Sequence, residues 1–358
     1  MSARRRDEAP PESDVLEGAL PPRRNKTLFG QTAAESAFLE AYKADRLPHA
    51  WLIGGRPGVG KATFAWRAAR FLTAHPDPRL PAVQRAADLY VDPDAKASHL
   101  IDSLSAPDIF LLRREWNFQG KPPKHFTEIR VDDARRALHM FHHNSANGGW
   151  RICIVDCADE LNKSSANALL KMVEEPPARA LFLILAHQPG RLLPTIRSRC
   201  RKLMLQPLAP ADIVQAIEAQ GEAFGKFGKA EVDKAARAAD GSVREAIRIL
   251  ARQGAASARL TDDLLHGLPT VDWGGVQKLT DAISRANASN EFDAFVETVF
   301  AWLDARVKEA AGQGPRRLAP LAEAWEKIGK SVRETEIYNL DKRALILGMF
   351  EELGAATR

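Results

Sequence analysis

Cysteine is scarce in this chain, with only Cys153, Cys157 and Cys200 among 358 residues. No two of them have the C-x-x-C spacing that is typical of a structural zinc site. Three cysteines are also too few for the disulfide framework of a small secreted protein. We therefore expect a protein of the reducing cytoplasm that carries no zinc.

Long apolar runs are lacking too. No stretch approaches the ~20 apolar residues that a membrane-spanning helix needs. The basic start of the chain, residues 1–8, is not followed by the apolar region of a secretory signal. The chain has only a small excess of positive charge, with 51 Lys and Arg residues and 46 Asp and Glu residues. This balance permits a nucleic-acid neighbour without indicating one, and we expect no membrane partner.

Hydrophobic patterning divides the chain into regions. With 45% hydrophobic residues, a chain of this length is expected to form two or three domains. A flexible tail is predicted over residues 1–25, which are rich in Pro, Arg and Glu. Alternating strands and helices over 26–207 predict an α/β domain, a parallel sheet flanked by helices. Helical spacing predicts a small helical lid over 208–256 and an all-α domain over 257–358.

Individual elements follow from the same patterns. Mostly apolar runs of strand length predict strands at 49–54, 109–112, 151–156 and the fully apolar 181–186, and residues 201–205 give one more. Helical spacing predicts helices at about 27–47, after Gly60, at about 132–141 and at 164–175. Residues 75–107 hold five prolines and show little periodicity, so we expect an insertion or a long connection there.

A phosphate-binding loop lies between the first strand and the next helix. Residues 55–61 have the spacing G-x-x-x-x-G-K. The glycines, Gly55, Gly58 and Gly60, let backbone N–H groups close around phosphate oxygens, and Lys61 adds a positive charge. The preceding strand and following helix are the context that this motif requires. The loop predicts a site for a nucleotide.

Two groups that hydrolysis needs are missing. Ala62 stands where a Ser or Thr hydroxyl would bind Mg²⁺, and Thr63 lies one residue on, about 100° round the helix. Asp156 ends an apolar strand of the Walker B kind, but Cys157 follows where active ATPases place a glutamate. Each loss costs on the order of 10²-fold in rate. We expect ATP or ADP to be held by the loop, with Thr63 and Asp156 beside it, little contribution from Mg²⁺ and little turnover.

With these residues in place, the chain resembles the bacterial clamp-loader AAA+ family of DNA polymerase III, and within it the delta-prime type of subunit. The similarity runs from about residue 26 onward. The segments that carry it are Leu28–Gln31, His49–Leu52, Ser165–Pro177, Leu193–Cys200, Gly241–Arg244 and Asn339–Lys342. Many family members have a cysteine-rich zinc module after the phosphate loop, where this chain has residues 75–107. His187 lies where an active member would present a small polar residue.

The resemblance implies an AAA+ domain, a helical lid and an all-α collar. It implies a non-motor stator that helps to load the sliding clamp onto primed DNA. Its implied partners are gamma/tau and delta subunits and, through the complex, the clamp and primer–template DNA. Arg199 would act as an arginine finger on ATP held by a neighbouring subunit. Arg244 would touch the chain's own nucleotide from the lid.

Other interpretations remain open at this point. From the residues alone, Arg199 is a surface charge beside Arg197 and Arg201. The chain could also be an ATP-hydrolysing subunit of the gamma/tau type, although the missing glutamate disfavours it. A small-molecule P-loop kinase is a third hypothesis, and it would need a substrate lid in place of the Gly241–Arg244 segment and the helical collar.

Overall fold

The computed structural model describes residues 12–13, 15–16, 18–120, 123–141, 148–254, 256–284, 289–311, 315–338 and 340–357. The chain divides into two compact units, Met1–Ile247 and Arg248–Arg358. This division separates the last part of the chain only. The domain boundaries expected at residues 25, 207 and 256 therefore stay predictions.

The first unit is built on a five-stranded sheet in the order β2-β5-β6-β1-β7, in which every pairing is parallel. Its strands are β1 (Ala50–Gly54), β2 (Ile109–Leu112), β5 (Arg151–Val155), β6 (Ala180–Ala186) and β7 (Arg201–Met204). Strand β1 lies between β6 and β7 rather than beside β2. The predicted parallel α/β class, a sheet flanked by helices, is confirmed.

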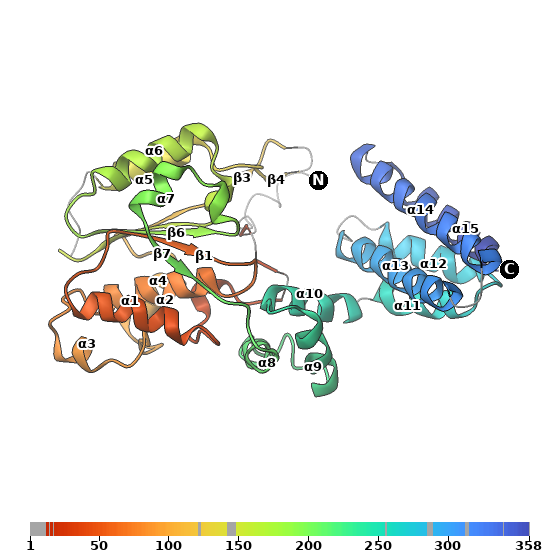
Figure 1. Cartoon of the computed structure of the whole chain (residues 1–358), viewed down its shortest axis with the longest axis horizontal. Helices are drawn as coiled ribbons and strands as arrows, with labels where there is room; N and C mark the ends of the chain where they lie inside the picture. Colours follow the sequence, from red (N-terminus) through yellow and green to blue (C-terminus); the bar gives the residue numbers. More distant parts are fainter. Residues whose placement is uncertain are drawn as a thin grey trace, which may run out of the picture. The chain divides into compact units, whose positions relative to one another are not determined.

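Helices cover both faces of the sheet (Figure 1). Successive strand residues point to opposite faces, so alternate residues of β1 enter different cores. Trp51 and Ile53 pack in one core, and Leu52 packs in the other. The helices on the first face are α1 (Thr32–Lys43), α2 (Lys61–Ala74), α3 (Pro81–Arg85) and α4 (Lys96–Asp102); those on the second are α5 (Val131–Phe141), α6 (Lys163–Glu174) and α7 (Pro194–Arg199).

Two of these helices lie in the region that we expected to be an irregular connection. Helices α3 and α4 fall within residues 75–107, and their side chains Val83 and Ile101 are fully buried in the first core. Pro81 occupies the start of α3, a position that tolerates proline because its missing N–H would have no helical partner. At least one of the prolines that suggested a loop therefore marks a helix start.

The N-terminal segment also differs from expectation where it is described. Residues Pro22–Arg24 form a short 3-10 helix, η1, and the Arg23 side chain is buried. Ionic contacts rather than apolar packing hold this segment, so hydropathy does not reveal its order. Residues 1–11, 14 and 17 of the predicted tail lie outside the described residues.

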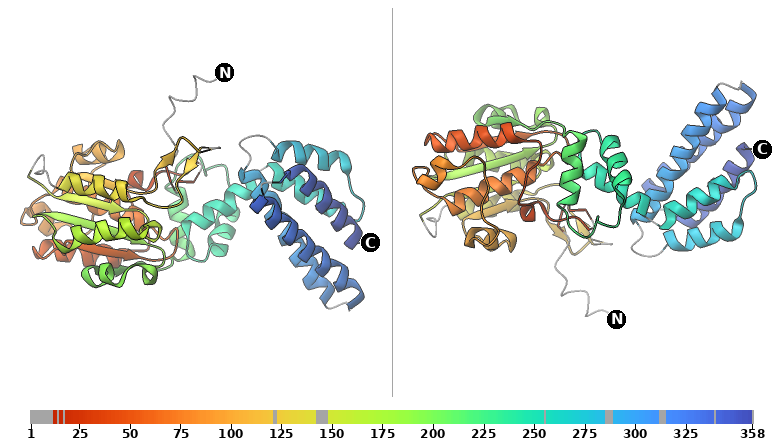
Figure 2. Two further views of the ribbon diagram at one scale, coloured as in Figure 1. Left: turned by 90° about the horizontal axis from the view of Figure 1, so that it is seen from above. Right: turned by 90° about the horizontal axis from the view of Figure 1, so that it is seen from below.

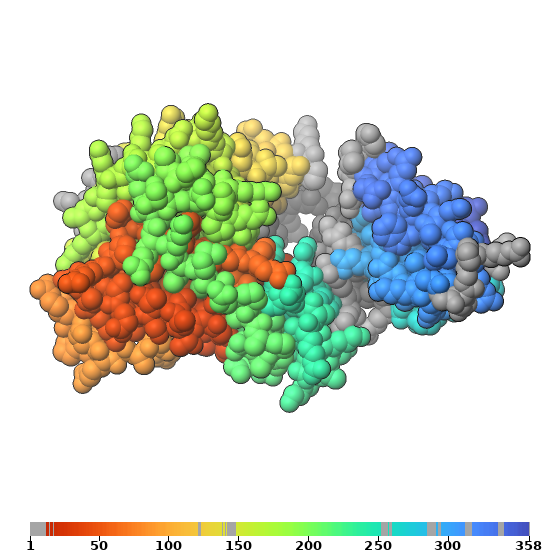
Figure 3. Space-filling model, viewed as in Figure 1, coloured from red at the N-terminus to blue at the C-terminus, as the bar shows by residue number. Residues whose placement is uncertain are grey.

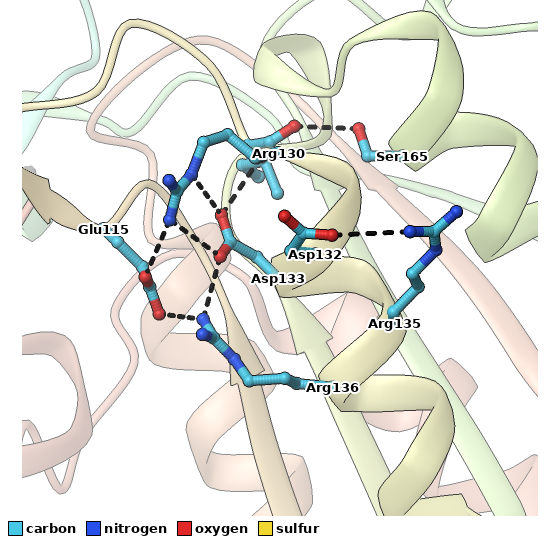
Figure 4. Close-up of polar contacts among 8 residues, drawn as sticks. Glu115, Arg130, Asp132, Asp133, Arg135, Arg136 and Ser165 are labelled. Atoms are coloured by element: carbon cyan, nitrogen blue, oxygen red, sulfur yellow. Dashed lines mark hydrogen bonds and ion pairs between the residues drawn. The ribbon is translucent and has the colours of Figure 1, made fainter.

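A small antiparallel hairpin, β3 (Trp116–Asn117) and β4 (Lys124–His125), follows β2 and was not predicted. An ionic cluster lies at its base (Figure 4). Glu115 pairs with Arg136 and with Arg130, the latter at 3.1 Å, while the buried Asp133 lies 2.8 Å from Arg136. These arginines are matched by carboxylates, so the cluster fastens the loop to α5 instead of forming an unbalanced basic surface.

The first unit ends in helical structure, as predicted past Pro207. Its helices are α8 (Pro210–Glu218), α9 (Lys229–Ala238) and the first part of α10 (Val243–Gly254). The apolar residues that predicted them, Ile213, Ala235 and Ile247 among them, are buried.

The described residues of the second unit form helices joined by turns and short connections. It contains the rest of α10, then α11 (Ala256–His266), α12 (Trp273–Ile283), α13 (Ser289–Ala311), α14 (Pro315–Tyr338) and α15 (Lys342–Ala356). Helix α13 contacts α11 and α14, and α15 contacts α12 and α14 (Figure 2). The stripe predicted along α13 is confirmed in Phe292, Phe295, Val299 and Leu303, which lie in the core of this unit. Asn339, part of the last family-like segment, lies outside the described residues.

Candidate nucleotide-binding site

The phosphate loop connects β1 to α2 and depends on glycine for two reasons. Gly58 and Gly60 have φ angles of +79° and +99°, a region that residues with a Cβ rarely adopt. A Cβ at Gly58 would also lie 2.2 Å from Ser242 Oγ and 2.8 Å from Arg244 N. The loop is therefore both left-handed and pressed against the start of α10.

Lys61, the first residue of α2, is only 5% exposed. Its Nζ donates hydrogen bonds to Gly55 O at 2.7 Å and to Arg56 O at 2.8 Å. Burial lowers the pKa of Lys61 to about 8, although nearby acidic groups, Asp156 among them, oppose that shift. The ammonium group thus points into the loop. Burial removes water from around this positive charge, and a bound phosphate would stabilise it.

A cavity of about 470 Å³ opens beside the loop. This is within the size range of small-molecule sites. Its walls bring together six of the eight predicted site residues: Gly58, Gly60, Lys61, Thr63, Asp156 and Arg244. Gly55 belongs to the loop but does not line the cavity, and a Cβ added there would lie 3.0 Å from Leu205 O. These walls fit a nucleotide, whereas the lining side chain of Ala62 offers Mg²⁺ no ligand.

Helix α10 closes the cavity from the lid side. The backbone N–H of Val243 donates to Gly58 O at 3.0 Å. This bond places Arg244, the next residue, on the cavity wall. The Gly241–Arg244 segment therefore contacts the phosphate loop directly.

Asp156 directly follows β5 and lines the cavity, but Cys157 turns away from it. The Cys157 thiol is 1% exposed and donates to Asp159 Oδ2 at 2.6 Å. Burial, followed by the bond to Asp159, raises the pKa of this thiol far above its usual value. Cys157 is therefore neutral and cannot act as a general base.

Asp159 belongs to the 3-10 helix η2 (Ala158–Glu160) and is committed to structural contacts. Its two carboxylate oxygens accept from the backbone N–H groups of His187 at 2.6 Å and Gln188 at 2.8 Å. Burial alone would raise the pKa of Asp159, but these bonds and the Cys157 thiol hold it below the usual value. Its lone pairs are directed to the loop after β6, so the carboxylate does not substitute for the missing glutamate.

Arg199 lies elsewhere on the first unit. It is not among the residues that line the chain's own cavity, and its side chain is 41% exposed. Its Nη2 lies 2.8 Å from Glu174 Oε1, and its Nη1 donates to Thr195 O at 3.1 Å. Arg199 ends the short helix α7, which begins at Pro194 and was not predicted.

One site residue was recognised only as part of a family-like segment. Gln31 is 4% exposed, and its amide N–H₂ donates to Val59 O at 3.2 Å and to Gln206 O at 2.7 Å. Its side-chain oxygen accepts from Gln206 N at 3.2 Å. Gln31 thereby ties the phosphate loop to the segment that leads into α8. In the sequence, only the family-like motif Leu28–Gln31 indicated that Gln31 belongs to the site, because no spacing rule predicts this contact.

The described residues contain neither a cluster of metal ligands nor a membrane-spanning helix. In that part of the chain, no three His, Cys, Asp or Glu side chains gather as a metal site would require. No described helix is both long and apolar enough to span a bilayer. The expected absence of zinc stays a prediction.

Several known proteins are similar to this chain. DNA polymerase III subunit delta' of Pseudomonas aeruginosa is 35% identical over 152 residues, which cover 42% of this chain and 41% of the relative. DNA polymerase III subunit gamma/tau of Mycobacterium bovis is 28% identical over 301 residues, which cover 82% of this chain and 46% of the relative. The chain thus spans less than half the length of these two relatives.

Among solved structures, a DNA polymerase III gamma subunit-related protein from Thermotoga maritima aligns with 90% of this chain and all of its own. The TM-score is 0.43 at 15% identity, and similarity this low supports no inference by itself.

A family model gives the clearest match. Residues 30–209, half of the chain, match the family described as DNA polymerase III, delta subunit. This range contains the phosphate loop, Asp156 and the Arg199 segment. The chain belongs to this DNA polymerase III delta-subunit family, and so to the clamp-loader proteins.

Proposed function

We propose that the chain is a non-motor subunit of the DNA polymerase III clamp loader, of the delta-prime type. It holds ATP or ADP without hydrolysing it efficiently. The observation that carries this proposal is the network beside Asp156: the Cys157 thiol is buried, and Asp159 is committed to backbone N–H groups. Ala62, without a hydroxyl, supports the same reading, because two groups that catalyse hydrolysis are then missing.

The proposed partners are gamma/tau and delta subunits, with the sliding clamp and primer–template DNA reached through the complex. The names of the relatives support this, since they are subunits of DNA polymerase III. The helical second unit would serve as the collar through which subunits assemble. We expect the protein to carry out this function in the cytoplasm.

Arg199 is the proposed contribution to catalysis in a neighbouring subunit. A guanidinium group is permanently charged and presents forked donors, which suit the charge that develops on a transferring phosphoryl group. Its position outside the chain's own cavity supports action on another nucleotide. The pair with Glu174 holds the side chain at the surface until it is used.

A second candidate is an ATP-hydrolysing subunit of the gamma/tau type. The observation in its favour is the longer match to gamma/tau, 82% of this chain against 42% for the delta' relative. The Cys157 and Ala62 substitutions count against it.

Steady-state hydrolysis by the isolated chain separates the two candidates. A non-motor subunit should turn over ATP at background rate, and its weak nucleotide affinity should change little when Mg²⁺ is added. An active gamma/tau subunit from the same preparation scheme is the positive control. Robust turnover, or a large gain in affinity with Mg²⁺, would favour the hydrolysing candidate instead.

A further inference from the structure

One wall of the cavity is a segment without sheet structure. Residues 18–26, here called the strap, precede α1 and contain η1. Leu20, Arg23 and Lys26 of the strap line the cavity. The strap therefore forms part of the same cavity wall as the phosphate loop and Asp156.

The strap is fastened by a residue of the 75–107 insertion. Asp102 ends α4, and its Oδ2 lies 2.5 Å from Lys26 Nζ. Its Oδ1 lies 3.0 Å from Nη2 of Arg70, a side chain only 2% exposed. Its backbone oxygen accepts from Arg23 Nε at 3.0 Å. The insertion lies at the surface against the N-terminal helices (Figure 3).

Helix α2 and the lid hold the strap as well. Arg67 and Arg70 of α2 donate to the backbone oxygens of Lys26 and Arg23. Helix α2 is the one whose first residue is Lys61, so the strap and the phosphate loop share a support. On the other side, Gln220 after α8 accepts from Leu20 N at 2.9 Å. The strap thus connects the insertion, the loop helix and the lid.

We propose that Asp102 is a positioning residue for the nucleotide site. Asp102 does not line the cavity, but its carboxylate holds the strap against the cavity. The time for which a nucleotide stays bound then depends on Asp102, and this gives residues 75–107 a role. The inference rests on the proposed nucleotide binding.

The negative charge of Asp102 is what holds the strap in this proposal. A buried cation is stable when a carboxylate balances it, and both the buried Arg70 and the half-buried Lys26 pair with Asp102. An amide in its place would keep the shape and a hydrogen-bond acceptor but remove the negative charge. Lys26 would then lose its counter-charge, and the strap, still held by its backbone hydrogen bonds, should open more often.

The test compares Asp102→Asn with Asp77→Asn in the full chain. Asp77 belongs to the same insertion, but its described partner is the exposed Arg79, so it is a matched control. Hydrogen exchange reports strap opening without any nucleotide, and stopped-flow release of a fluorescent ADP analogue reports the site. In Asp102→Asn we expect the strap amides to exchange about tenfold faster and the analogue to be released about tenfold faster. This is the effect expected for loss of one charge-assisted hydrogen bond. Asp77→Asn should match wild type, and Asp102→Glu should recover part of the loss.

Lys26→Met is a second variant, because it leaves the Asp102–Arg70 pair in place and so preserves folding. Unchanged strap exchange in both variants would overturn the inference. Faster strap exchange with unchanged release would also overturn it, because the strap would then be structural only. Failure of the wild-type chain to bind the analogue at any concentration would instead refute the proposed nucleotide site, and the positioning role with it.

Discussion

Lys61 links the nucleotide site to pH. In the free protein burial holds its pKa at about 8, below the usual 10.5. A bound phosphate favours the charged amine, so the pKa must be higher in the complex. Below pH 8 the amine is protonated in both states, and affinity should not change with pH. Above pH 8 only the complex keeps the proton, so affinity should fall as pH rises, by up to about tenfold per pH unit.

Equilibrium titration of ADP between pH 7 and pH 9.5 checks this expectation. Lys61→Arg is the control, because a guanidinium stays charged throughout and its profile should be flat. A flat wild-type profile would show that Lys61 does not contact the phosphates.

Ala62 accounts for the expected indifference to Mg²⁺. Ala62→Ser returns a hydroxyl to the first turn of α2, where it can bind the metal. We expect Mg²⁺ to strengthen ATP binding several-fold in this variant, by about 1 kcal/mol, while turnover stays at background. Substantial hydrolysis by Ala62→Ser alone would mean that the carboxylate missing at Cys157 is supplied by another group.

The surroundings of Cys157 do not accommodate the glutamate that active ATPases have at this position. Cys157→Glu would bury a second carboxylate against Asp159, which already lies 2.6 Å from the thiol. Repulsion and overpacking should destabilise the fold by about 2–4 kcal/mol. Cys157→Ser keeps a donor of similar size and should cost about 1 kcal/mol or less. Thermal unfolding of the two variants measures the difference, and equal melting temperatures would contradict the account of this network.

At the scale of elements, the contact between the phosphate loop and α10 is the most restrictive. Gly58→Ala places a methyl group 2.2 Å from Ser242 Oγ at a φ of +79°. The strain should cost about 1–3 kcal/mol and weaken nucleotide binding, because α10 must move away from the loop. Gly190→Ala is the matched control, since nothing lies within 4 Å of its added methyl. Chemical denaturation reports stability; equal losses in both variants would show that the loop and lid are not tightly packed.

The central strands β1, β5 and β6 could be predicted because their mostly apolar runs are buried throughout. β2 was predicted to the residue, and β5, β6 and β7 within one residue. Helices α3, α4 and α7 were missed because they are short and begin or lie among prolines, and the two-residue strands of the hairpin carry no periodicity. Six site residues converge as the motifs indicated. The strap and Asp102 could not be foreseen, because ion pairs between residues 76 apart leave no local pattern.

At the scale of the whole molecule, the division at Ile247 and Arg248 suggests separable tasks. The first unit has its own sheet, cavity and cores, and the second has a helical core of its own. A chain truncated after residue 256 should therefore fold and keep the nucleotide site, but should no longer assemble with partner subunits. Co-expression and purification of the complex tests this. Retention of the truncated chain in complete complexes would contradict the collar role.

We propose that this chain acts on a neighbour's ATP while hydrolysing little itself. The most direct measurement is DNA- and clamp-stimulated ATP hydrolysis, with clamp loading, in complexes rebuilt with Arg199→Ala. Arg201→Ala, an exposed arginine two residues on, is the control, and Arg199→Lys tests the need for forked donors. Arg199 is exposed, so its loss should leave folding and assembly intact.

Arginine fingers contribute about 10³–10⁵ in rate at the site that they serve. With one of several sites disabled, we predict that total hydrolysis falls modestly and clamp loading falls steeply in Arg199→Ala, with incomplete recovery in Arg199→Lys. Wild-type hydrolysis and loading in the Arg199→Ala complex would contradict the account and return Arg199 to a surface charge paired with Glu174.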